Sequence, residues 1–148
     1  IQSSDDSRVL LAYAACLAAI AEDDPSQKPL ALDTFRQVFN SDEDDTLRTD
    51  ALRRWVHLNG LQGASETLAS HNGLVSTDPY LRYARAASQR DTAEAAFLLA
   101  ELQAVTADAE DPSIQGSAIL LHAQINPDPR KALALLDEHW RALLTQPS

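Results

Sequence analysis

The sequence predicts an all-α protein, and three observations carry that prediction. Alanine and leucine dominate the apolar residues, which make up 45% of the 148 residues, whereas aromatic residues make up only 5%. Alanine and leucine lead the ranking of helix propensity, and the β-branched residues that favour strands are sparse. Asp-Pro pairs also recur just before apolar segments of helical period. We therefore expect about eight helices and no strand.

The Asp-Pro pairs are interpreted as helix starts. Aspartate can accept hydrogen bonds from the free amides of a first helical turn, and proline has no amide to leave unpaired there. Glu94, three residues after Asp91, adds the pattern of a capping box, while Gly60 and Gly73 are expected to end helices. The pairs stand at Asp24-Pro25, Asp78-Pro79, Asp111-Pro112 and Asp128-Pro129.

These signals divide the chain into helices joined by short connections, which favours antiparallel helical hairpins. The most apolar helix contains the run 9–21, which is shorter than the about 20 residues of a membrane-spanning helix. We interpret this segment as a buried helix, with Cys16 as an inert packing residue, and expect no membrane insertion. The predicted helices cover roughly residues 7–22, 29–40, 46–59, 61–71, 79–89, 92–106, 112–125 and 129–145.

The net charge of −10 restricts the classes of partner. Binding to a nucleic-acid backbone or to an anionic membrane surface needs clustered Lys and Arg, so we expect neither as a partner. The single cysteine, Cys16, excludes an internal disulfide framework and a multi-thiolate metal site. Because the chain begins at Ile1 and contains no methionine, we expect one helical-repeat domain, 1–148, that is a fragment of a longer protein.

A small residue followed four positions later by a large one recurs in alternate predicted helices. Such a pair suits a place where two helices approach closely. The small residues follow one another at a mean interval of about 34 residues, the period of helix pairs that stack into one continuous core. The pairs are Ala31/Phe35, Ala64/Leu68, Ala95/Leu99 and Ala132/Leu136.

Two stretches carry this pattern most clearly. In "RRWVHLNGLQGASETL" Trp55 lies late in a first helix and Ala64 opens the second, and in "AILLHAQINPDPRKALALL" Ala132 has the place of Ala64. Through these stretches the chain resembles the tetratricopeptide-repeat superfamily, in a divergent form and over nearly its whole length. The resemblance implies a TPR-like, right-handed α-solenoid of about four antiparallel helical hairpins. A helical bundle without repeats is the alternative fold.

The sequence offers no motif for catalysis, metal binding or cofactor binding. It has no His-Glu-x-x-His, no Cys-x-x-Cys and no Gly-rich phosphate loop, so we expect neither an enzyme nor a cofactor. Asp137, Glu138 and His139 are adjacent, but neighbours on a helix point about 100° apart and cannot all face one ligand. His139 and His71 each follow the small residue of their pair by the same interval, so we expect both at half-buried packing positions.

Arginines are concentrated in two of the predicted first helices, and this feature points to binding. Arginine has a planar fork that can bind both oxygens of a carboxylate. In tetratricopeptide arrays the first helices line a concave groove, so the resemblance implies a basic groove that selects an acidic segment or a C-terminal peptide. Pairing of Asp50 with Arg53 and Arg54 along a solvated surface is the simpler interpretation. The predicted partner-binding residues are Arg48, Arg53, Arg54, His57, Arg82, Arg85 and Gln89.

The fold class and the charge pattern predict a protein interaction or scaffold module that holds a partner peptide or protein in a concave helical groove. One alternative is an oligomerisation or assembly subunit of a trafficking, secretion or envelope complex. Such a subunit would join like or unlike copies through apolar surfaces near Trp140 or Leu143. Another alternative is a helical appendage of an enzyme whose catalytic domain lies elsewhere in the longer chain.

Overall fold

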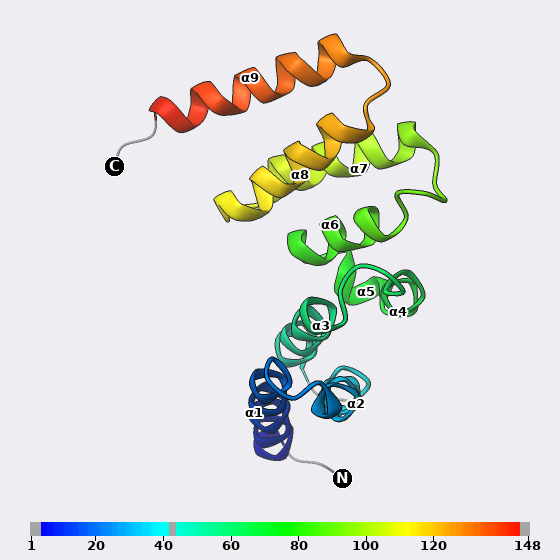
Figure 1. Cartoon of the computed structure of the whole chain (residues 1–148), viewed down its shortest axis with the longest axis vertical. Coiled ribbons are helices and arrows are strands. Elements are labelled where there is room, and N and C mark those ends of the chain that lie inside the picture. The colour runs from blue at the N-terminus through cyan, green and yellow to red at the C-terminus, as the bar shows by residue number, and fades with distance from the viewer. Residues whose placement is uncertain (1–3, 42–43, 146–148) are drawn as a thin grey trace. The chain divides into compact units, whose positions relative to one another are not determined.

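The structure is a computed structural model that describes residues 4–41 and 44–145, and side-chain burial for residues 6–41 and 44–141. Within these ranges the chain is all-helical and contains no strand, as the composition predicts (Figure 1). In chain order the elements are α1 (Ser4–Ala21), the 3-10 helix η1 (Pro25–Gln27), α2 (Lys28–Phe39), α3 (Asp45–Asn59), α4 (Ser65–Ser70), α5 (Asn72–Val75), α6 (Pro79–Ser88), α7 (Ala95–Asp108), α8 (Pro112–Ile125) and α9 (Pro129–Thr145).

The Asp-Pro pairs start helices, as predicted. Asp78 accepts a hydrogen bond from the backbone amide of Leu81 at 2.9 Å, and Asp111 accepts one from that of Ser113 at 2.8 Å. The first pair starts η1 rather than an α-helix, with Asp24 as the capping residue. Because cap and proline together define the first turn, the observed bounds of α8 and α9 agree with the predicted ones.

The predicted helix 61–71 is shorter in the structure. Gly60 ends α3 as expected, and both Gly60 and Gly63 have positive φ, 86° and 80°. A residue in this left-handed region cannot continue a right-handed helix, so the chain turns here and α4 begins only at Ser65. Gly73, expected to end a helix, lies inside the short helix α5.

The capping box predicted from Asp91 and Glu94 is wrong. Glu94 is itself the residue before the first turn of α7, and its side chain makes no capping hydrogen bond. The backbone amides of Thr92 and Ala93 instead bond to the carbonyl oxygen of Gln89. That turn after α6 keeps the segment from opening a helix until Ala95.

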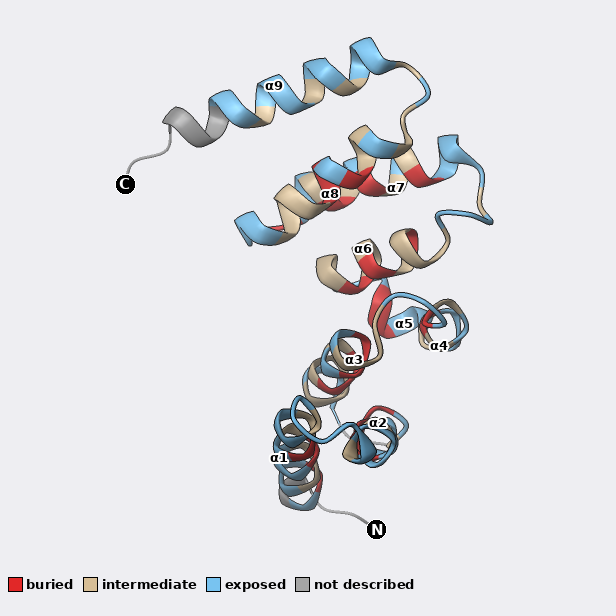
Figure 2. Ribbon diagram, in the orientation of Figure 1, coloured by how far each residue is buried: buried red, intermediate tan, exposed pale blue. Residues whose placement is uncertain are grey.

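The helices gather into two compact units, unit 1 (Ile1–Leu74) and unit 2 (Val75–Ser148). In unit 1, α1 packs against α2 and α2 against α3, and α1 also contacts α3. Buried residues lie on each of α1, α2 and α3 (Figure 2). The predicted pairs Ala31/Phe35 and Ala64/Leu68 are buried, and α2, which carries the first pair, packs against α1 and α3. The largest fully buried side chains of unit 1 are Phe35, Val38, Phe39, Leu52, Val56 and Leu68.

The interpretation of segment 9–21 as a buried helix is wrong in part. Ala14 and Leu17 are buried, but Cys16 is exposed, together with several large apolar side chains of α1. The reason is that α1 is apolar around most of its circumference while its contacts within unit 1 are with α2, η1 and α3. Neighbouring helices cover one side of α1 and leave Cys16 on the other.

In unit 2, α7 packs against α6 and α8, and α8 also contacts α9. The pair Ala95/Leu99 does not have its predicted role, because Ala95 is exposed and Leu99 is only half-buried. The pair Ala132/Leu136 also falls short, with Ala132 half-buried and Leu136 exposed. The core cluster is made instead by Ala86, Leu98, Leu102, Val105, Ala118 and Leu121.

Candidate functional site

The predicted partner-binding residues fall into both units. Arg48, Arg53, Arg54 and His57 lie on α3 of unit 1, whereas the other members of the set belong to unit 2. On α3, Arg54 Nε lies 3.1 Å from Asp50 Oδ1, which is the surface ion pair that the sequence spacing indicates. Arg53 is half-buried and His57 is exposed.

Arg48 holds the start of α3 against the end of α2. Its Nε donates a hydrogen bond to the carbonyl oxygen of Phe39 at 3.1 Å, and its Nη1 lies 3.2 Å from Asp45 Oδ1. The carbonyl of Phe39 belongs to the last turn of α2, where backbone oxygens lack partners within the helix. The guanidinium of Arg48 therefore joins the start of α3 to the end of α2.

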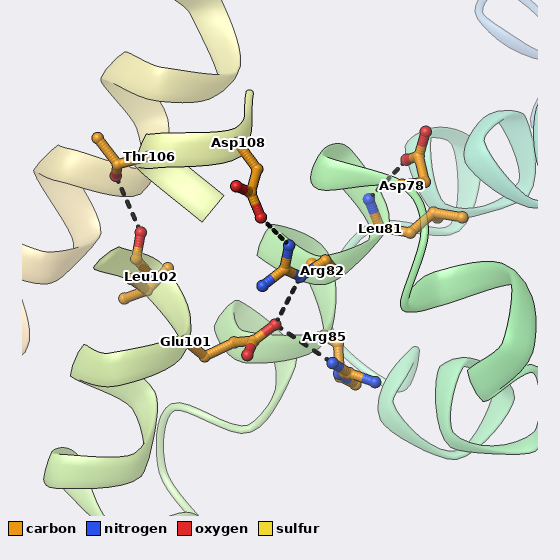
Figure 3. Close-up of polar contacts among 8 residues, drawn as sticks. All are labelled: Asp78, Leu81, Arg82, Arg85, Glu101, Leu102, Thr106 and Asp108. Carbon is orange, nitrogen blue, oxygen red and sulfur yellow. Dashed lines mark hydrogen bonds and ion pairs between the residues drawn. The ribbon is translucent and has the colours of Figure 1, made fainter. Parts of the chain in front are cut away.

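The two arginines of α6 form a network with α7 (Figure 3). Arg82 Nε lies 2.9 Å from Glu101 Oε1 and Arg82 Nη1 lies 2.8 Å from Asp108 Oδ2, while Arg85 Nη2 lies 3.3 Å from the same oxygen of Glu101. The side chain of Arg82 is only 15% exposed. Hydrogen bonds to Glu101 and then to Asp108 raise the pKa of Arg82. These arginines hold α6 against α7, and Gln89 is half-buried just after α6.

The two histidines expected at packing positions are half-buried, as predicted. His71 packs edge-on against Phe39, with 4.8 Å between the ring centroids. His139 faces α8, where its Nε2 would lie 3.8 Å from a Cβ atom added to Gly116. Asp137, two residues before His139, forms an ion pair with Arg141 at 3.1 Å.

A pocket of about 440 Å³ lies entirely within unit 1. It is bordered by the last turns of α2 and α3, by Gly63 in the turn that follows α3, and by α4. Most of the groups around it are polar, and one large aromatic ring is among them. The lining residues are Arg36, Trp55, Asn59, Gly63, Glu66, Thr67, Ser70 and His71.

The guanidinium of Arg36, an exposed residue, lies over two aromatic rings beside this pocket. Its guanidinium carbon lies 5.4 Å from the centroid of the Trp55 ring and 5.9 Å from that of the Phe39 ring. Both distances are within the range of cation–π attraction. Among the described residues Arg36 forms no ion pair, although Arg48, Arg54 and three further arginines do. A guanidinium on a ring keeps its N–H edge available for an anionic group.

His71 joins two walls of the pocket. Its Nδ1 lies 2.9 Å from the carbonyl oxygen of Thr67, and its Nε2 lies 2.7 Å from Oδ1 of Asn40, the residue that caps the end of α2. Since a carbonyl oxygen can only accept, Nδ1 carries a hydrogen atom. These contacts, with the Phe39 ring, hold the end of α4 beside the end of α2.

Trp55, which lines the pocket, has a buried polar atom without a hydrogen-bond partner among the described residues. The indole Nε1 of this buried side chain has no hydrogen-bond partner within the part of the chain that the structure describes. A buried N–H without an acceptor lowers the free energy of unfolding by about 1–3 kcal/mol, so such groups are rare in folded proteins. An oxygen atom supplied by a ligand is one group that would satisfy it.

The sequence prediction missed this site because its parts come from three helices. Arg36 and Phe39 are three positions apart on α2, a spacing that places them on one face and could have drawn attention. Trp55 lies on α3, and no spacing rule relates it to Arg36. The predicted set was also confined to the helices expected to come first in their hairpins, whereas Arg36 lies on α2, which was expected to come second.

A metal centre and a membrane span would each need a recognisable set of residues. Within residues 4–41 and 44–145, no group of three or more His, Cys, Asp or Glu is placed to hold a metal ion. No helix in these ranges combines the length and the apolar character that crossing a membrane would require.

Comparisons with known proteins complete the description of the site. No protein-family model, no curated protein and no solved structure matches this chain.

Proposed function

We propose that this chain is a protein-binding module whose unit 1 pocket receives an acidic, C-terminal end of a partner peptide. The observation that carries the proposal is Arg36, a guanidinium held over the Trp55 ring without an ion-pair partner among the described residues. In a chain of net charge −10, the guanidinium of Arg36 lies over an aromatic ring rather than beside a carboxylate among the described residues. A carboxylate supplied from outside is its natural complement.

The orientation of Arg36 supports carboxylate recognition. A guanidinium stacked on an aromatic ring has few accessible rotamers, so it loses less entropy when a ligand binds. Its N–H edge can then form two parallel hydrogen bonds to one carboxylate. Hydrogen bonds to charged groups contribute about 1.5–3 kcal/mol each, enough to fix the register of a weakly held peptide.

The remaining lining residues suit a peptide backbone. The side chains of Asn59 and Ser70 donate to backbone carbonyls of unit 1, and their oxygen atoms can still accept from a peptide amide. The hydroxyl of Thr67, which also lines the pocket, can donate or accept. Glu66 disfavours a second acidic group on the side of the pocket that it lines. Together they support a partner with one carboxylate-rich end rather than a uniformly acidic partner.

We also propose that the helices form a TPR-like solenoid. Five pairs of helices that follow one another in the chain pack together within their unit: α1 with α2, α2 with α3, α6 with α7, α7 with α8, and α8 with α9. The buried pairs Ala31/Phe35 and Ala64/Leu68 support the same packing in unit 1. This order of contacts is typical of helical-hairpin repeats.

The function is tested with short fluorescent peptides that end in Glu with a free C-terminus. The matched neutral probe ends in Gln amide. Fluorescence anisotropy should show that the acidic probe binds at least about tenfold more tightly, because charge-assisted hydrogen bonds are lost with the neutral one. Arg36→Gln should remove that preference, while circular dichroism remains that of the parent.

Arg54→Gln is the matched control, because Arg54 is an exposed arginine of the same unit that already pairs with Asp50. It should leave peptide binding unchanged. If Arg54→Gln abolishes binding and Arg36→Gln does not, the arginines of α3 carry recognition and the pocket proposal is wrong. Equal affinity of the parent for both probes overturns carboxylate recognition altogether.

A further inference from the structure

Helix α1 has a second apolar side that the other described helices of unit 1 leave uncovered. Ala14 and Leu17 face the core, whereas several larger apolar side chains of α1 are exposed, with Val9 68% exposed. Their spacing of four, three and four residues places them in one stripe along the helix. This α1 stripe consists of Val9, Tyr13, Cys16 and Ile20.

Helix α9 repeats this arrangement in unit 2. Ala132, Leu135 and His139 are half-buried on the side toward α8, while a different set of large apolar residues is exposed. Leu143, expected in the same surface, has a side chain outside the described residues. The α9 stripe consists of Leu133, Leu136 and Trp140, which are 68%, 39% and 60% exposed.

The charges that follow the α1 stripe and those that precede the α9 stripe have opposite signs. The α1 stripe is followed by the exposed acidic residues Glu22, Asp23 and Asp24, and Asp6, also exposed, precedes it. Arg8, an exposed basic residue of α1, lies about 100° from Val9 around the helix. The flanks of the α1 stripe are therefore mainly acidic.

The α9 stripe begins beside basic residues, whereas the exposed acidic residues Asp137 and Glu138 lie further along the helix. Exposed Arg130 and Lys131 precede it, and Arg141 follows Trp140, where it forms an ion pair with Asp137. Asp128 accepts a hydrogen bond from the backbone amide of Arg130 at 3.0 Å, so one carboxylate lies near this end. The start of α9 still carries more positive than negative side chains.

Both charged ends oppose the dipole of their own helix. The C-terminal end of a helix favours cations and its N-terminal end favours anions. Helix α1 has no basic residue in its last turn and runs into three acidic residues, whereas α9 has no acidic residue in its first turn and begins with two bases; all of these positions are described by the structure. If the end of α1 lay beside the start of α9, the acidic residues of α1 would face the basic residues of α9. Both unfavourable interactions with the helix dipoles would then be reduced.

We propose that the α1 stripe of one copy of this chain packs, antiparallel, on the α9 stripe of a second copy. Every copy carries both stripes, so the complementary surface is present wherever the protein is. The contact is heterologous, because two different faces meet, and it can extend to chains of several copies. This self-association is independent of the unit 1 pocket and goes beyond the proposed peptide binding.

The size of the contact sets the expected affinity. One helix face from each copy buries less than a standard protein interface, so association should be micromolar or weaker. Apolar contact of the stripes provides most of the attraction, and the charged flanks set the orientation. Added salt should weaken association by screening those flanks.

The first measurement is the mass of the 148-residue chain in solution, by sedimentation velocity over about 1 µM to 1 mM. We expect the 16.1 kDa monomer at the low end and a rising mean mass at the high end. Tyr13→Glu and Trp140→Glu should each keep the protein monomeric over this range. Phe97→Glu, at an exposed aromatic residue outside both stripes, is the matched control and should associate like the parent.

Mixing the two variants gives the decisive result. Tyr13→Glu keeps an intact α9 stripe and Trp140→Glu keeps an intact α1 stripe, so the mixture should form dimers and stop there. A mixture that stays monomeric overturns the proposal, as does a parent that is monomeric at every concentration. Loss of association through only one of the two substitutions would indicate a symmetric contact and would also overturn it.

Folding and orientation have their own checks. Circular dichroism should match the parent, and Val9→Glu with Leu133→Glu repeats the mixing experiment at other residues of the stripes. Asp23→Lys and Arg130→Glu should each weaken association, while the double variant, with exchanged signs, should regain it. A double variant weaker than either single variant would rule out the antiparallel arrangement.

Discussion

Nε of Arg82 lies 2.9 Å from Oε1 of Glu101, and the same carboxylate oxygen lies 3.3 Å from Nη2 of Arg85. One glutamate of α7 therefore holds two arginines of α6, in a partly buried place where the side chain of Glu101 is 19% exposed. The arginines predicted to meet a partner's carboxylate on α6 are bound by a carboxylate of their own chain.

Removal of the charge of Glu101 should destabilise unit 2. Glu101→Gln leaves two partly buried guanidinium groups without their shared carboxylate, which should lower the free energy of unfolding by about 1–3 kcal/mol. Urea unfolding followed by circular dichroism measures the change. Asp108→Asn is the control, since Asp108 is 62% exposed and should cost less than about 1 kcal/mol. Equal effects of the two substitutions would contradict the central place of Glu101.

The packing register of α7 can be tested with two adjacent leucines. Leu98 is fully buried, so Leu98→Ala should cost about 2–5 kcal/mol of stability, whereas Leu99→Ala at a half-buried site should cost clearly less. Urea unfolding of both variants measures the two values side by side. The reverse order would support the register in which Ala95 and Leu99 form the packing pair.

The single cysteine provides a test of the exposed side of α1. Because Cys16 is exposed, it should react with a thiol reagent in the folded protein without denaturant, completely and about as fast as in the unfolded chain. The measurement is made at low protein concentration, where the proposed association of copies is absent. A thiol that reacts only after unfolding would restore the interpretation of α1 as a buried helix.

Stability should depend on pH through His122, because burial lowers the pKa of this side chain below its usual value of 6.5. The unfolded chain then binds the proton more readily than the folded protein. The contribution of neutral His122 to the free energy of unfolding is complete above the usual pKa. It is lost as the pH falls from the usual pKa to the lower pKa of the folded state. Urea unfolding at several pH values should show that acidification lowers the free energy of unfolding less in His122→Gln than in the parent. His57→Gln, at an exposed histidine, is the control, and the same acid sensitivity in all three proteins would contradict the prediction.

Local signals in the sequence determined where most helices begin and end. Asp111 and Pro112 start α8 because a carboxylate can cap the free amides of a first turn and proline lacks an amide, and both facts are independent of the rest of the fold. Gly60 ends α3 through its positive φ for the same kind of reason. Spacing along one helix likewise predicted the ion pair of Arg54 with Asp50.

Only the tertiary structure decided which side of an apolar helix is buried and which charged groups meet. In α7 nearly every side is apolar, so Leu98 and Leu99 are equally suitable for a core, and the contacts with α6 and α8 select Leu98. Cys16 is exposed for the corresponding reason in α1. Arg82 and Glu101, like Arg36 and Trp55, are 19 residues apart on different helices. Pairings at such a separation depend on how helices pack, which is a property of the whole unit and not of any short segment.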